Sequence, residues 1–220
     1  MPELSEEELK ELADQLRCPN GEQGILVAEN MNSSNASMIS ETIESIPFSK
    51  VSSILELGHG NCSHLTALLS KKTGISYYGL EISEAMQSTA LSLNKSLSET
   101  GNIFFDLYNG TNIPFNNNQF DCVFSINTIY FWEKPEELLT EIHRVLKPDG
   151  ILLLTFTSKE TLEKLAFSKF GFNLYTLSDI ERLAAHSGFT TEKIIEKKEN
   201  AISKMGTPVE RTFYIIQLKK

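Results

Sequence analysis

The feature that most constrains the fold is an alternation of short apolar runs with longer amphipathic stretches in the middle of the chain. Five runs rich in β-branched or aromatic residues have turn residues nearby: VSSILEL, ISYYGLE, NIFFDLY, FDCVFSI and GILLLTF. Helical stretches lie between them at about 63–72, 83–97 and 135–146. Strands that alternate with helices predict an α/β fold with a parallel, doubly wound sheet.

The N-terminal segment has a different pattern, which predicts two helices. Ser5 and Glu8 have the spacing of a capping box, and leucines follow at helical intervals as far as Cys18. The stretch from residue 21 is rich in small polar residues, so we expect a loop there. A helix follows in this prediction and ends at Pro47.

The C-terminal segment predicts a helix and a pair of strands. Ser178 and Glu181 have the spacing of a second capping box, and Gly188 ends the helix that they begin. The two following runs, FTTEKIIEKK and RTFYIIQLK, have the composition of strands. Because they are the last two elements, we expect them to form an antiparallel hairpin.

The length and charge of the chain limit its organisation and its partners. With 220 residues there is room for one α/β domain, which we place at 47–220, with a helical segment at 1–46 beside it. The formal net charge of −9 opposes binding to nucleic acid or to an anionic membrane, since both need clustered Lys and Arg. We therefore expect neither partner, and a small substrate that is neutral or cationic.

The cysteines and the start of the chain bear on its compartment. Cys18, Cys62 and Cys122 form neither a CxxC pair nor a metal-ligand spacing, so we expect reduced thiols and no metal site. The first residues lack the basic leader and apolar run of a signal peptide, and no run approaches the ~20 apolar residues of a membrane-spanning helix. We expect a cytoplasmic protein that is a monomer or a homodimer.

The segment ILELGHGNCSHLTALL is the most informative for function. Gly58 and Gly60 allow a sharp turn and a close approach of ligand to backbone, and the start of the next helix offers N–H groups to an anion. Glu81 ends the next apolar run 23 residues after Gly58, near the ~20 residues expected for a carboxylate that binds ribose hydroxyls. Each feature alone is ordinary, but together they predict a nucleoside site.

The identity of the nucleoside depends on a residue that is missing. The dinucleotide fingerprint requires a third glycine where this chain has Ser63, so that helix and strand pack closely beside a pyrophosphate. A nicotinamide or flavin dinucleotide is therefore disfavoured. A short-chain dehydrogenase is disfavoured for the same reason.

The glycine turn, Glu81 and a longer run later in the chain together resemble a known family. The run is FDCVFSINTIYFWEKPEELLTEIHRVLKPDGILLLT. Over roughly residues 50–158 the chain resembles the class I S-adenosylmethionine-dependent methyltransferases of the small-molecule type (methyltransferase domain 11-like). The resemblance implies a Rossmann-like α/β fold with a seven-stranded, mostly parallel sheet and an antiparallel C-terminal hairpin. It also implies S-adenosyl-L-methionine as cofactor, S-adenosyl-L-homocysteine as product and a small-molecule methyl acceptor.

The resemblance assigns parts of the cofactor to single residues. Glu56, Gly58 and Gly60 match the family's first motif, beside the methionine portion, and His59 is the variable residue of that turn. Glu81 matches the carboxylate that binds the ribose. The full set of cofactor-binding residues that the resemblance implies is Glu56, Gly58, His59, Gly60, Glu81, Ile82, Asn109, Gly110 and Asn127.

The chain departs from the family pattern at two positions. Cys62 stands where the family often has a third glycine of the first motif, which puts the affinity for the cofactor in doubt. Asn109 and Gly110 stand where the family has Asp-Ala, and the amide oxygen of Asn109 can still accept a hydrogen bond from the adenine amino group. The segment around Met31 resembles one that folds over the cofactor in some relatives, so 1–46 is either a lid or an ordinary surface segment.

The catalytic residues are not identified by the sequence. Methyl transfer from a sulfonium needs mainly an acceptor held in line, so a general base is optional. Tyr130, Glu133, His59, His64 and His143 are the candidate bases, and each histidine is more simply explained as a packing or surface residue. Tyr130 is the weak first choice because it follows the fourth apolar run, and we expect it to line the substrate pocket.

A second function remains open for the same fold. A non-catalytic protein that binds S-adenosylmethionine or another nucleoside would keep the glycine turn and Glu81 and lose the acceptor pocket. The departures at Cys62 and Asn109 give this alternative its weight. Cofactor binding without methyl transfer to any acceptor would distinguish it from the enzyme.

Overall fold

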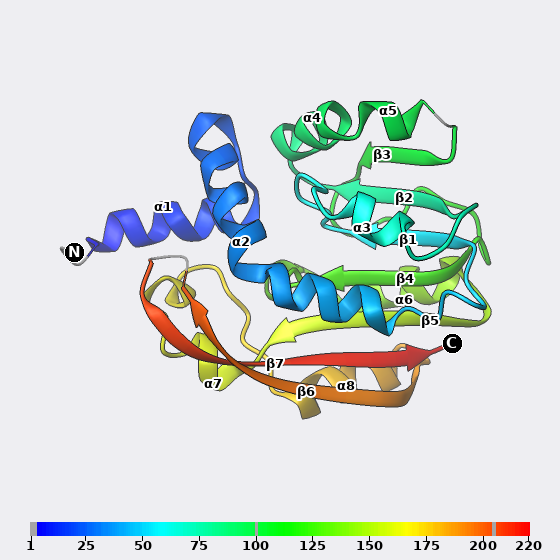
Figure 1. Ribbon diagram of the computed structural model, residues 1–220. Helices are drawn as coiled ribbons and strands as arrows, with labels where there is room; N and C mark the ends of the chain where they lie inside the picture. The colour runs from blue at the N-terminus through cyan, green and yellow to red at the C-terminus, as the bar shows by residue number, and fades with distance from the viewer. Residues whose placement is uncertain (1–3, 100, 204–205) are drawn as a thin grey trace.

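The computed structural model describes residues 4–99, 101–203 and 206–220, which form a seven-stranded sheet with helices on both faces (Figure 1). The strands are β1 (Ser53–Leu57), β2 (Ser76–Glu81), β3 (Ile103–Leu107), β4 (Phe120–Ile126), β5 (Leu146–Thr157), β6 (Thr190–Ile202) and β7 (Pro208–Lys219). The helices are α1 (Glu6–Arg17), α2 (Gly21–Ser45), α3 (Leu65–Leu69), α4 (Glu84–Leu93), α5 (Lys95–Ser98), α6 (Pro135–Val145), α7 (Lys159–Leu162) and α8 (Leu177–His186), with 3₁₀ turns η1 (Ile129–Phe131) and η2 (Ala166–Lys169).

The sheet has the order β3-β2-β1-β4-β5-β7-β6. The first five strands in this order pair in parallel, and β7 is antiparallel to both β5 and β6. The predicted α/β class, the seven strands and the C-terminal hairpin are therefore confirmed. The strand order reverses between β1 and β4, and ligands of such sheets bind beside the carboxyl ends of the strands at this point.

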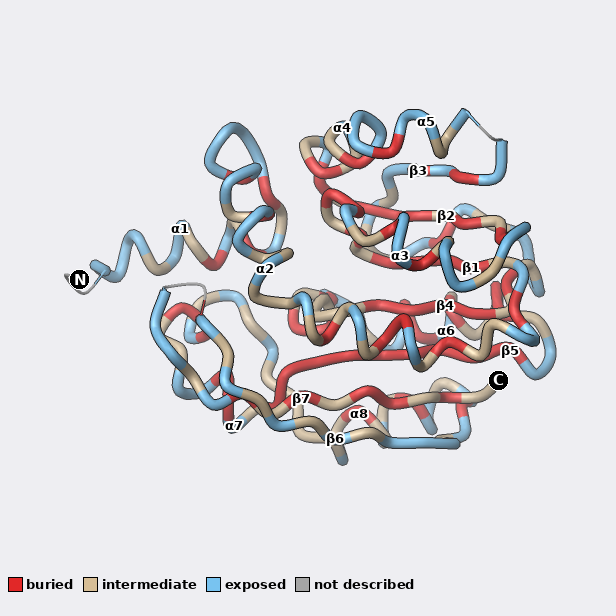
Figure 2. Tube along the Cα trace, in the orientation of Figure 1, coloured by how far each residue is buried: buried red, intermediate tan, exposed pale blue. Residues whose placement is uncertain are grey.

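Two hydrophobic cores cover the two faces of the sheet. One core packs side chains of α2, α3 and α4 against β1, β2 and β4, and the other packs α6 and α8 against the opposite face. Figure 2 shows that the buried residues concentrate along the central strands. The sequences of these strands are mostly apolar, as in β4 and β5. Such strands are buried on both faces, which explains why apolar runs rather than alternating patterns predicted them.

The N-terminal segment differs from the prediction in one element. Helix α2 is continuous from Gly21, so the loop expected at its start is wrong. An added Cβ at Gly24 would lie 2.8 Å from the carbonyl carbon of Pro19, so glycine permits the tight corner between α1 and α2. Met38 is fully buried, and the Thr42 hydroxyl lies 2.7 Å from that of Thr155 on β5. These tertiary contacts outweigh the low helix propensity of a Ser- and Asn-rich segment.

Three helix boundaries also need correction. The cap of α8 is Thr176, which forms a capping box with Asp179 in place of the predicted pair two residues later. Helix α3 is only five residues long and begins at Leu65, because the preceding residues continue the glycine turn. The helix predicted over 83–97 is interrupted at Asn94, whose side chain donates hydrogen bonds to the carbonyl groups of Cys62 and Ala90.

Candidate active site

The turn after β1 has the conformation that its glycines allow. Gly58 has φ +73° and its N–H donates to the Leu80 carbonyl at 2.8 Å. A Cβ at Gly58 would lie 2.5 Å from Cγ2 of Thr128, so packing excludes any side chain there. A Cβ at Gly60, with φ +56°, would meet nothing within 4 Å. The backbone at Gly60 therefore borders open space, as the site for a ligand requires.

The carboxylate of Glu81 lies beside this turn at the end of β2. Its Oε2 accepts the Gly60 N–H at 2.9 Å, and its Oε1 accepts the N–H groups of Ile82 at 2.7 Å and Ser83 at 3.1 Å. Glu81 is 5% exposed. The carboxylate is thus held by backbone donors at the turn between the strand and α4, with one edge toward the cleft described below.

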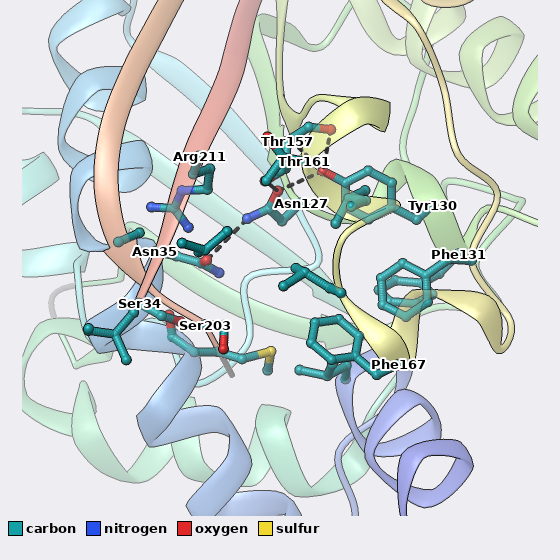
Figure 3. Close-up of a pocket in the computed structure, with 18 residues that line it drawn as sticks. Ser34, Asn35, Asn127, Tyr130, Phe131, Thr157, Thr161, Phe167, Ser203 and Arg211 are labelled. Carbon is teal, nitrogen blue, oxygen red and sulfur yellow. Dashed lines mark hydrogen bonds between the residues drawn. The ribbon is translucent and has the colours of Figure 1, made fainter. Parts of the chain in front are cut away.

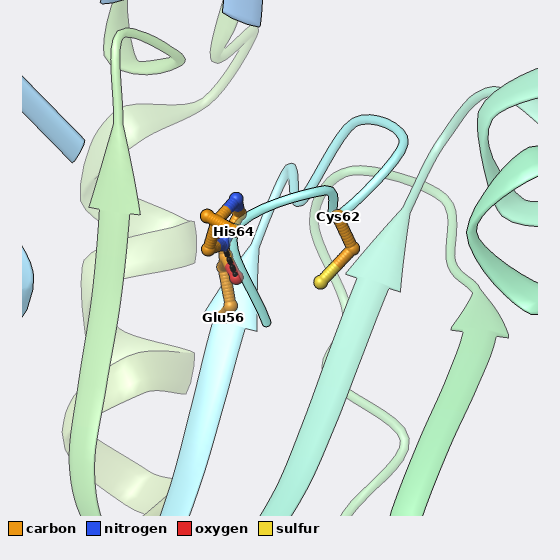
Figure 4. A group of neighbouring side chains, drawn as sticks. All are labelled: Glu56, Cys62 and His64. Carbon is orange, nitrogen blue, oxygen red and sulfur yellow. Dashed lines mark hydrogen bonds and ion pairs between the residues drawn. The ribbon is translucent and has the colours of Figure 1, made fainter. Parts of the chain in front are cut away.

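A buried polar cluster forms the floor beneath the glycine turn (Figure 4). Oε2 of Glu56 lies 2.9 Å from Nε2 of His64 and also accepts the hydroxyl of Tyr77, which in turn lies 3.1 Å from Sγ of Cys62. Burial alone would raise the pKa of Glu56, but His64 and Tyr77 lower it overall. Burial would lower the pKa of His64, and the carboxylate of Glu56 raises it overall.

Potential metal ligands occur in this cluster, although the sequence predicted none. Atoms of Glu56, Cys62 and His64 lie within 4.8 Å of one another. Burial and the charge of Glu56 raise the pKa of the Cys62 thiol well above its ordinary value, which opposes the thiolate that a metal requires. The ion pair and hydrogen bonds already account for the carboxylate of Glu56, so we assign the cluster a structural role.

Cys62 occupies the position of the family's third glycine without changing the backbone. Its φ of +50° is in the left-handed region that glycine would adopt. Its side chain is fully buried, and its thiol contacts Tyr77 on the side of the turn that faces the core. The departure at this position therefore costs backbone strain and leaves the ligand side of the turn open.

His59 is buried beside the same turn. Its Nδ1 lies 2.6 Å from the Gly60 carbonyl, and its ring packs edge-on against Phe105. Within the described part of the chain, its buried Nε2 has no hydrogen-bond partner. Burial lowers the pKa of His59, which favours the neutral ring. Gly79 makes room for it, since a Cβ there would lie 2.6 Å from the ring.

These elements surround a cleft of about 970 Å³, counting space open to solvent, at the carboxyl ends of β1, β2 and β4. Eight of the predicted cofactor-binding residues line it: Glu56, Gly58, His59, Gly60, Glu81, Ile82, Gly110 and Asn127. Asn109 is not among its lining residues; its Oδ1 accepts the N–H groups of Thr111 and Asn112 in the turn after β3. The role of Asn109 at the adenine stays a prediction.

The N-terminal helices form the opposite wall of this cleft. Leu16, Pro19, Met31, Asn32 and Asn35 line it from α1, α2 and the corner between them. Among the contacts that connect these helices to the main domain, Arg17 pairs with Glu133, and the Ser83 hydroxyl donates to the Pro19 carbonyl. Sequence reasoning singled out Met31 but missed the other wall residues, which have no local motif.

A second cavity of about 600 Å³ adjoins the first (Figure 3). The two cavities share the lining residues Leu16, Met31, Asn35, Asn127 and Phe131. Residues from α2, η1, α7, η2 and the β6–β7 hairpin complete the second cavity. Most of these residues are apolar or aromatic, and they come from several separate segments of the chain.

Tyr130 lines this second cavity, and its hydroxyl forms hydrogen bonds with two neighbouring groups. It donates to Oδ1 of Asn127 at 2.8 Å and accepts the N–H of Thr157. Burial raises its pKa well above the ordinary value, so the hydroxyl remains protonated.

Tyr130 also stands four residues before Lys134, which is the Tyr-x-x-x-Lys spacing of short-chain dehydrogenases. Lys134 instead pairs with Glu137 on the surface.

Asn127 forms the wall between the cavities, with φ +57° at the end of β4. Its Nδ2 donates to Oδ1 of Asn35 at 3.1 Å, and its Oδ1 accepts from Tyr130 and from the Thr157 hydroxyl at 3.2 Å. This network orients a polar amide between the two spaces. Two other candidate bases lie outside both cavities: Glu133 pairs with Arg17, and His143 on α6 packs against Phe189.

No helix within residues 4–99, 101–203 and 206–220 combines the length and apolar character needed to cross a bilayer. Cys18, Cys62 and Cys122 form no disulfide in this structure, and Cys122 is buried in the sheet.

Comparison with known proteins gives one family match. Residues 55–154 match the family described as "Methyltransferase domain". The ubiquinone/menaquinone biosynthesis C-methyltransferase UbiE of Enterobacter sp. (strain 638) is 28% identical over 141 residues, which are 61% of this chain and 54% of the relative. The chain thus spans about half the length of the curated relatives it matches.

Solved structures share the fold at low sequence identity. An S-adenosylmethionine-dependent methyltransferase from Mesorhizobium loti superposes with a TM-score of 0.63 at 14% identity and covers 87% of this chain and 100% of that one. The [4+2]-cyclase SpnF superposes with a TM-score of 0.69 at 13% identity over 84% and 80% of the two chains. Because proteins of different activity share this fold, the fold alone does not decide the reaction.

Proposed function

We propose that this chain is a class I S-adenosylmethionine-dependent methyltransferase that methylates a small-molecule acceptor, as the match of residues 55–154 to a methyltransferase domain supports. The observation that carries the proposal is the pair of adjoining cavities with a common wall. One cavity contains the glycine turn and Glu81, and the other is an apolar space beyond Asn127. A two-substrate transfer requires two such spaces in contact, whereas a simple binder needs one.

The residues of the cleft fit S-adenosylmethionine. The open space beside Gly60 admits the ligand close to the backbone, and Glu81 is placed to accept hydrogen bonds from the ribose hydroxyls. Ile82, Met86 and Tyr108 offer apolar surface for the adenine. The carboxylate of Glu81 lines the cleft and favours a ligand with a sulfonium and an ammonium group.

The protein contributes position more than proton transfer. When bound, the cofactor supplies an electrophilic methyl group on a positive sulfur. Asn127 and Asn35 lie where the cavities meet and can orient the acceptor atom between them. Holding both reactants in line lowers the entropic part of the barrier. Tyr130 holds Asn127 in place and is not assigned the role of a base, because its hydroxyl is protonated and bonded to the backbone.

The segment at 1–46 is proposed to cover the cofactor. Its helices form one wall of the cleft, and the contacts Arg17–Glu133 and Ser83–Pro19 connect this wall to the domain. Both contacts must break if the helices move aside to admit the ligand. The buried Met38 and the hydrogen bond between Thr42 and Thr155 hold the C-terminal half of α2 against the sheet, so such a movement is confined to α1 and the start of α2.

Calorimetry and a transfer assay test the proposed function. Ligand-stripped protein is titrated with S-adenosylmethionine and with S-adenosylhomocysteine, and methyl release is then measured with a panel of phenols, amines, thiols and activated carbon acids. Binding together with transfer to one acceptor class supports the enzyme. Binding without any transfer favours the non-catalytic alternative, and the absence of binding rejects both.

A further inference from the structure

The second cavity has a polar end and an aromatic end. Figure 3 shows Arg211, Asn35 and Ser34 on one side of the space and Tyr130, Phe131 and Phe167 on the other, with Asn127 between them. Phe172 packs against Phe131, with ring centroids 4.6 Å apart, and extends the aromatic end. A ligand that fills the space must therefore have an apolar body and a polar group.

Arg211 gives the polar end its charge. It is the one charged side chain among the described residues that line this cavity. The residue is 7% exposed and lies on β7, with its guanidinium carbon 5.9 Å from the ring centroid of Phe213. A guanidinium remains protonated at any physiological pH and binds oxyanions through its planar N–H groups.

The acidic partner of Arg211 lies outside this cavity. Oε1 of Glu199 accepts from Nε of Arg211 at 2.8 Å and also from Nη2, and the Ser37 hydroxyl lies 3.3 Å from Nη2. Glu199 lines the neighbouring surface groove together with Arg211, but it does not line the apolar cavity. Nη1 forms no hydrogen bond within residues 4–99, 101–203 and 206–220. Arg211 thus lines the cavity and keeps donor capacity that Glu199 and Ser37 do not use.

We propose that the methyl acceptor is an amphipathic anion, with an apolar or aromatic body against Phe131, Phe167 and Phe172 and one oxyanion group, such as a carboxylate, bound by Arg211. This inference rests on the proposed function, since it assigns the apolar cavity to the acceptor. The atom that receives the methyl then lies between the two ends, near Asn35 and Asn127. The net charge of the chain predicted a neutral or cationic substrate, but charge at the lining, not the total, determines which ligand a buried cavity prefers.

A matched pair of dyes tests the charge preference. 8-Anilinonaphthalene-1-sulfonate and N-phenyl-1-naphthylamine have the same aromatic body and differ by one sulfonate. Their affinities are measured by fluorescence in the presence of saturating S-adenosylhomocysteine, so that the cofactor cleft is filled. We expect Arg211→Met to weaken the sulfonate dye about tenfold and the neutral dye less than about twofold, as the loss of a charge-assisted hydrogen bond predicts.

Three variants serve as controls. Glu199→Gln should strengthen binding of the sulfonate dye about threefold, because it removes the competing carboxylate and leaves Arg211 in place. A purely structural ion pair would give no such gain. Arg182→Met, on the exposed face of α8, should change neither affinity. Ala201→Trp, on the cavity lining, should weaken both dyes if they occupy this cavity.

The outcomes separate the inference from the proposed function. If Arg211→Met lowers the affinity for both dyes equally, the cavity has collapsed in that variant, and the Glu199→Gln variant then decides. A higher affinity of Glu199→Gln for the sulfonate dye supports the inference, and an unchanged affinity overturns it. Unchanged binding of the sulfonate dye in Arg211→Met overturns it directly. Failure of S-adenosylhomocysteine to bind in calorimetry would instead reject the proposed function, whichever way the dyes behave.

Discussion

The two cavities of this protein differ in how they are built. One side of the proposed cofactor cleft is formed by neighbouring residues of two loops, the glycine turn after β1 and the end of β2, which backbone hydrogen bonds hold at the carboxyl ends of the strands. The acceptor cavity is formed by single residues from six or more separate elements. The first kind of site is specified by a local motif, and the second only by the packing of distant segments.

The two cavities also differ in charge. Glu81, a carboxylate with no cationic partner among the described residues, lines the proposed cofactor cleft, and Arg211 is the charged residue of the proposed acceptor cavity within the described parts of the chain. Opposite local charges in adjoining spaces favour the binding of a cationic cofactor and an anionic acceptor side by side. The comparison teaches that the net charge of a chain does not determine the charge preference of each of its sites. The following predictions test whether the two cavities behave independently.

Glu81→Ala should have the largest effect, and only on the cofactor cleft. Loss of two hydrogen bonds to a charged group corresponds to about 3 kcal/mol or more, so affinity for S-adenosylmethionine should fall more than ~100-fold. Calorimetry measures the change. Dye binding in the acceptor cavity should be unaffected. Glu84→Ala, at an exposed position on α4, is the matched control. A loss of less than ~3-fold would contradict the assignment of Glu81.

Glu56→Gln should destabilise the protein by about 3 kcal/mol near pH 6, because it breaks a buried ion pair. Pairing raises the pKa of His64, so its contribution to stability is complete below about pH 6.5, the ordinary pKa, and is lost as pH rises through the raised value. As pH rises through the raised pKa of His64, the free energy of unfolding of the wild type should therefore fall by up to about 1.4 kcal/mol per pH unit because of this group. The free energy of unfolding of Glu56→Gln should not show this fall.

Denaturant unfolding between pH 5.5 and 8.5 measures this difference. Glu137→Gln is the matched control, since its partner Lys134 is exposed and such pairs contribute about 1 kcal/mol or less. Parallel pH profiles for the wild type and Glu56→Gln would show that the pair does not set the protonation of His64.

Tyr130→Phe should affect the common wall of the two cavities. The change leaves the buried N–H of Thr157 without its acceptor and removes a donor to Asn127, at a cost of about 1 to 3 kcal/mol in unfolding free energy. Turnover should fall less than about tenfold, because the hydroxyl orients and does not remove a proton. Tyr214→Phe on β7 is the control. A 1000-fold loss of turnover with intact cofactor binding would make the hydroxyl catalytic.

Cys62 offers the smallest and most local test. Cys62→Gly and Cys62→Ala both remove the thiol, but only alanine keeps a Cβ at φ +50°. The glycine variant should be as stable as the alanine variant or more stable by about 1 kcal/mol. Affinity for S-adenosylmethionine should change less than ~3-fold in both, because the thiol faces the core. A clearly more stable alanine variant would show that the turn is not strained.

The predicted fold was correct in the elements whose pattern is local. The five apolar runs became β1 to β5, and the terminal runs became the β6–β7 hairpin. Helix α2 was mispredicted because its Ser- and Asn-rich sequence has low intrinsic helix propensity, and contacts such as Thr42 with Thr155 compensate for it. The cap of α8 was displaced by two residues because Thr176 and Ser178 both have an acidic residue three positions later.

The sequence by itself determined the α/β class, the glycine turn and the acidic side chain at the end of β2, because each depends on residues close together in the chain. Only the tertiary structure decided that α1 and α2 wall the cleft, that the hydroxyl of Tyr130 is engaged, and that Arg211 charges the second cavity. The physical reason is that a cavity lining consists of side chains brought together by packing, and no local pattern specifies which distant residues will meet.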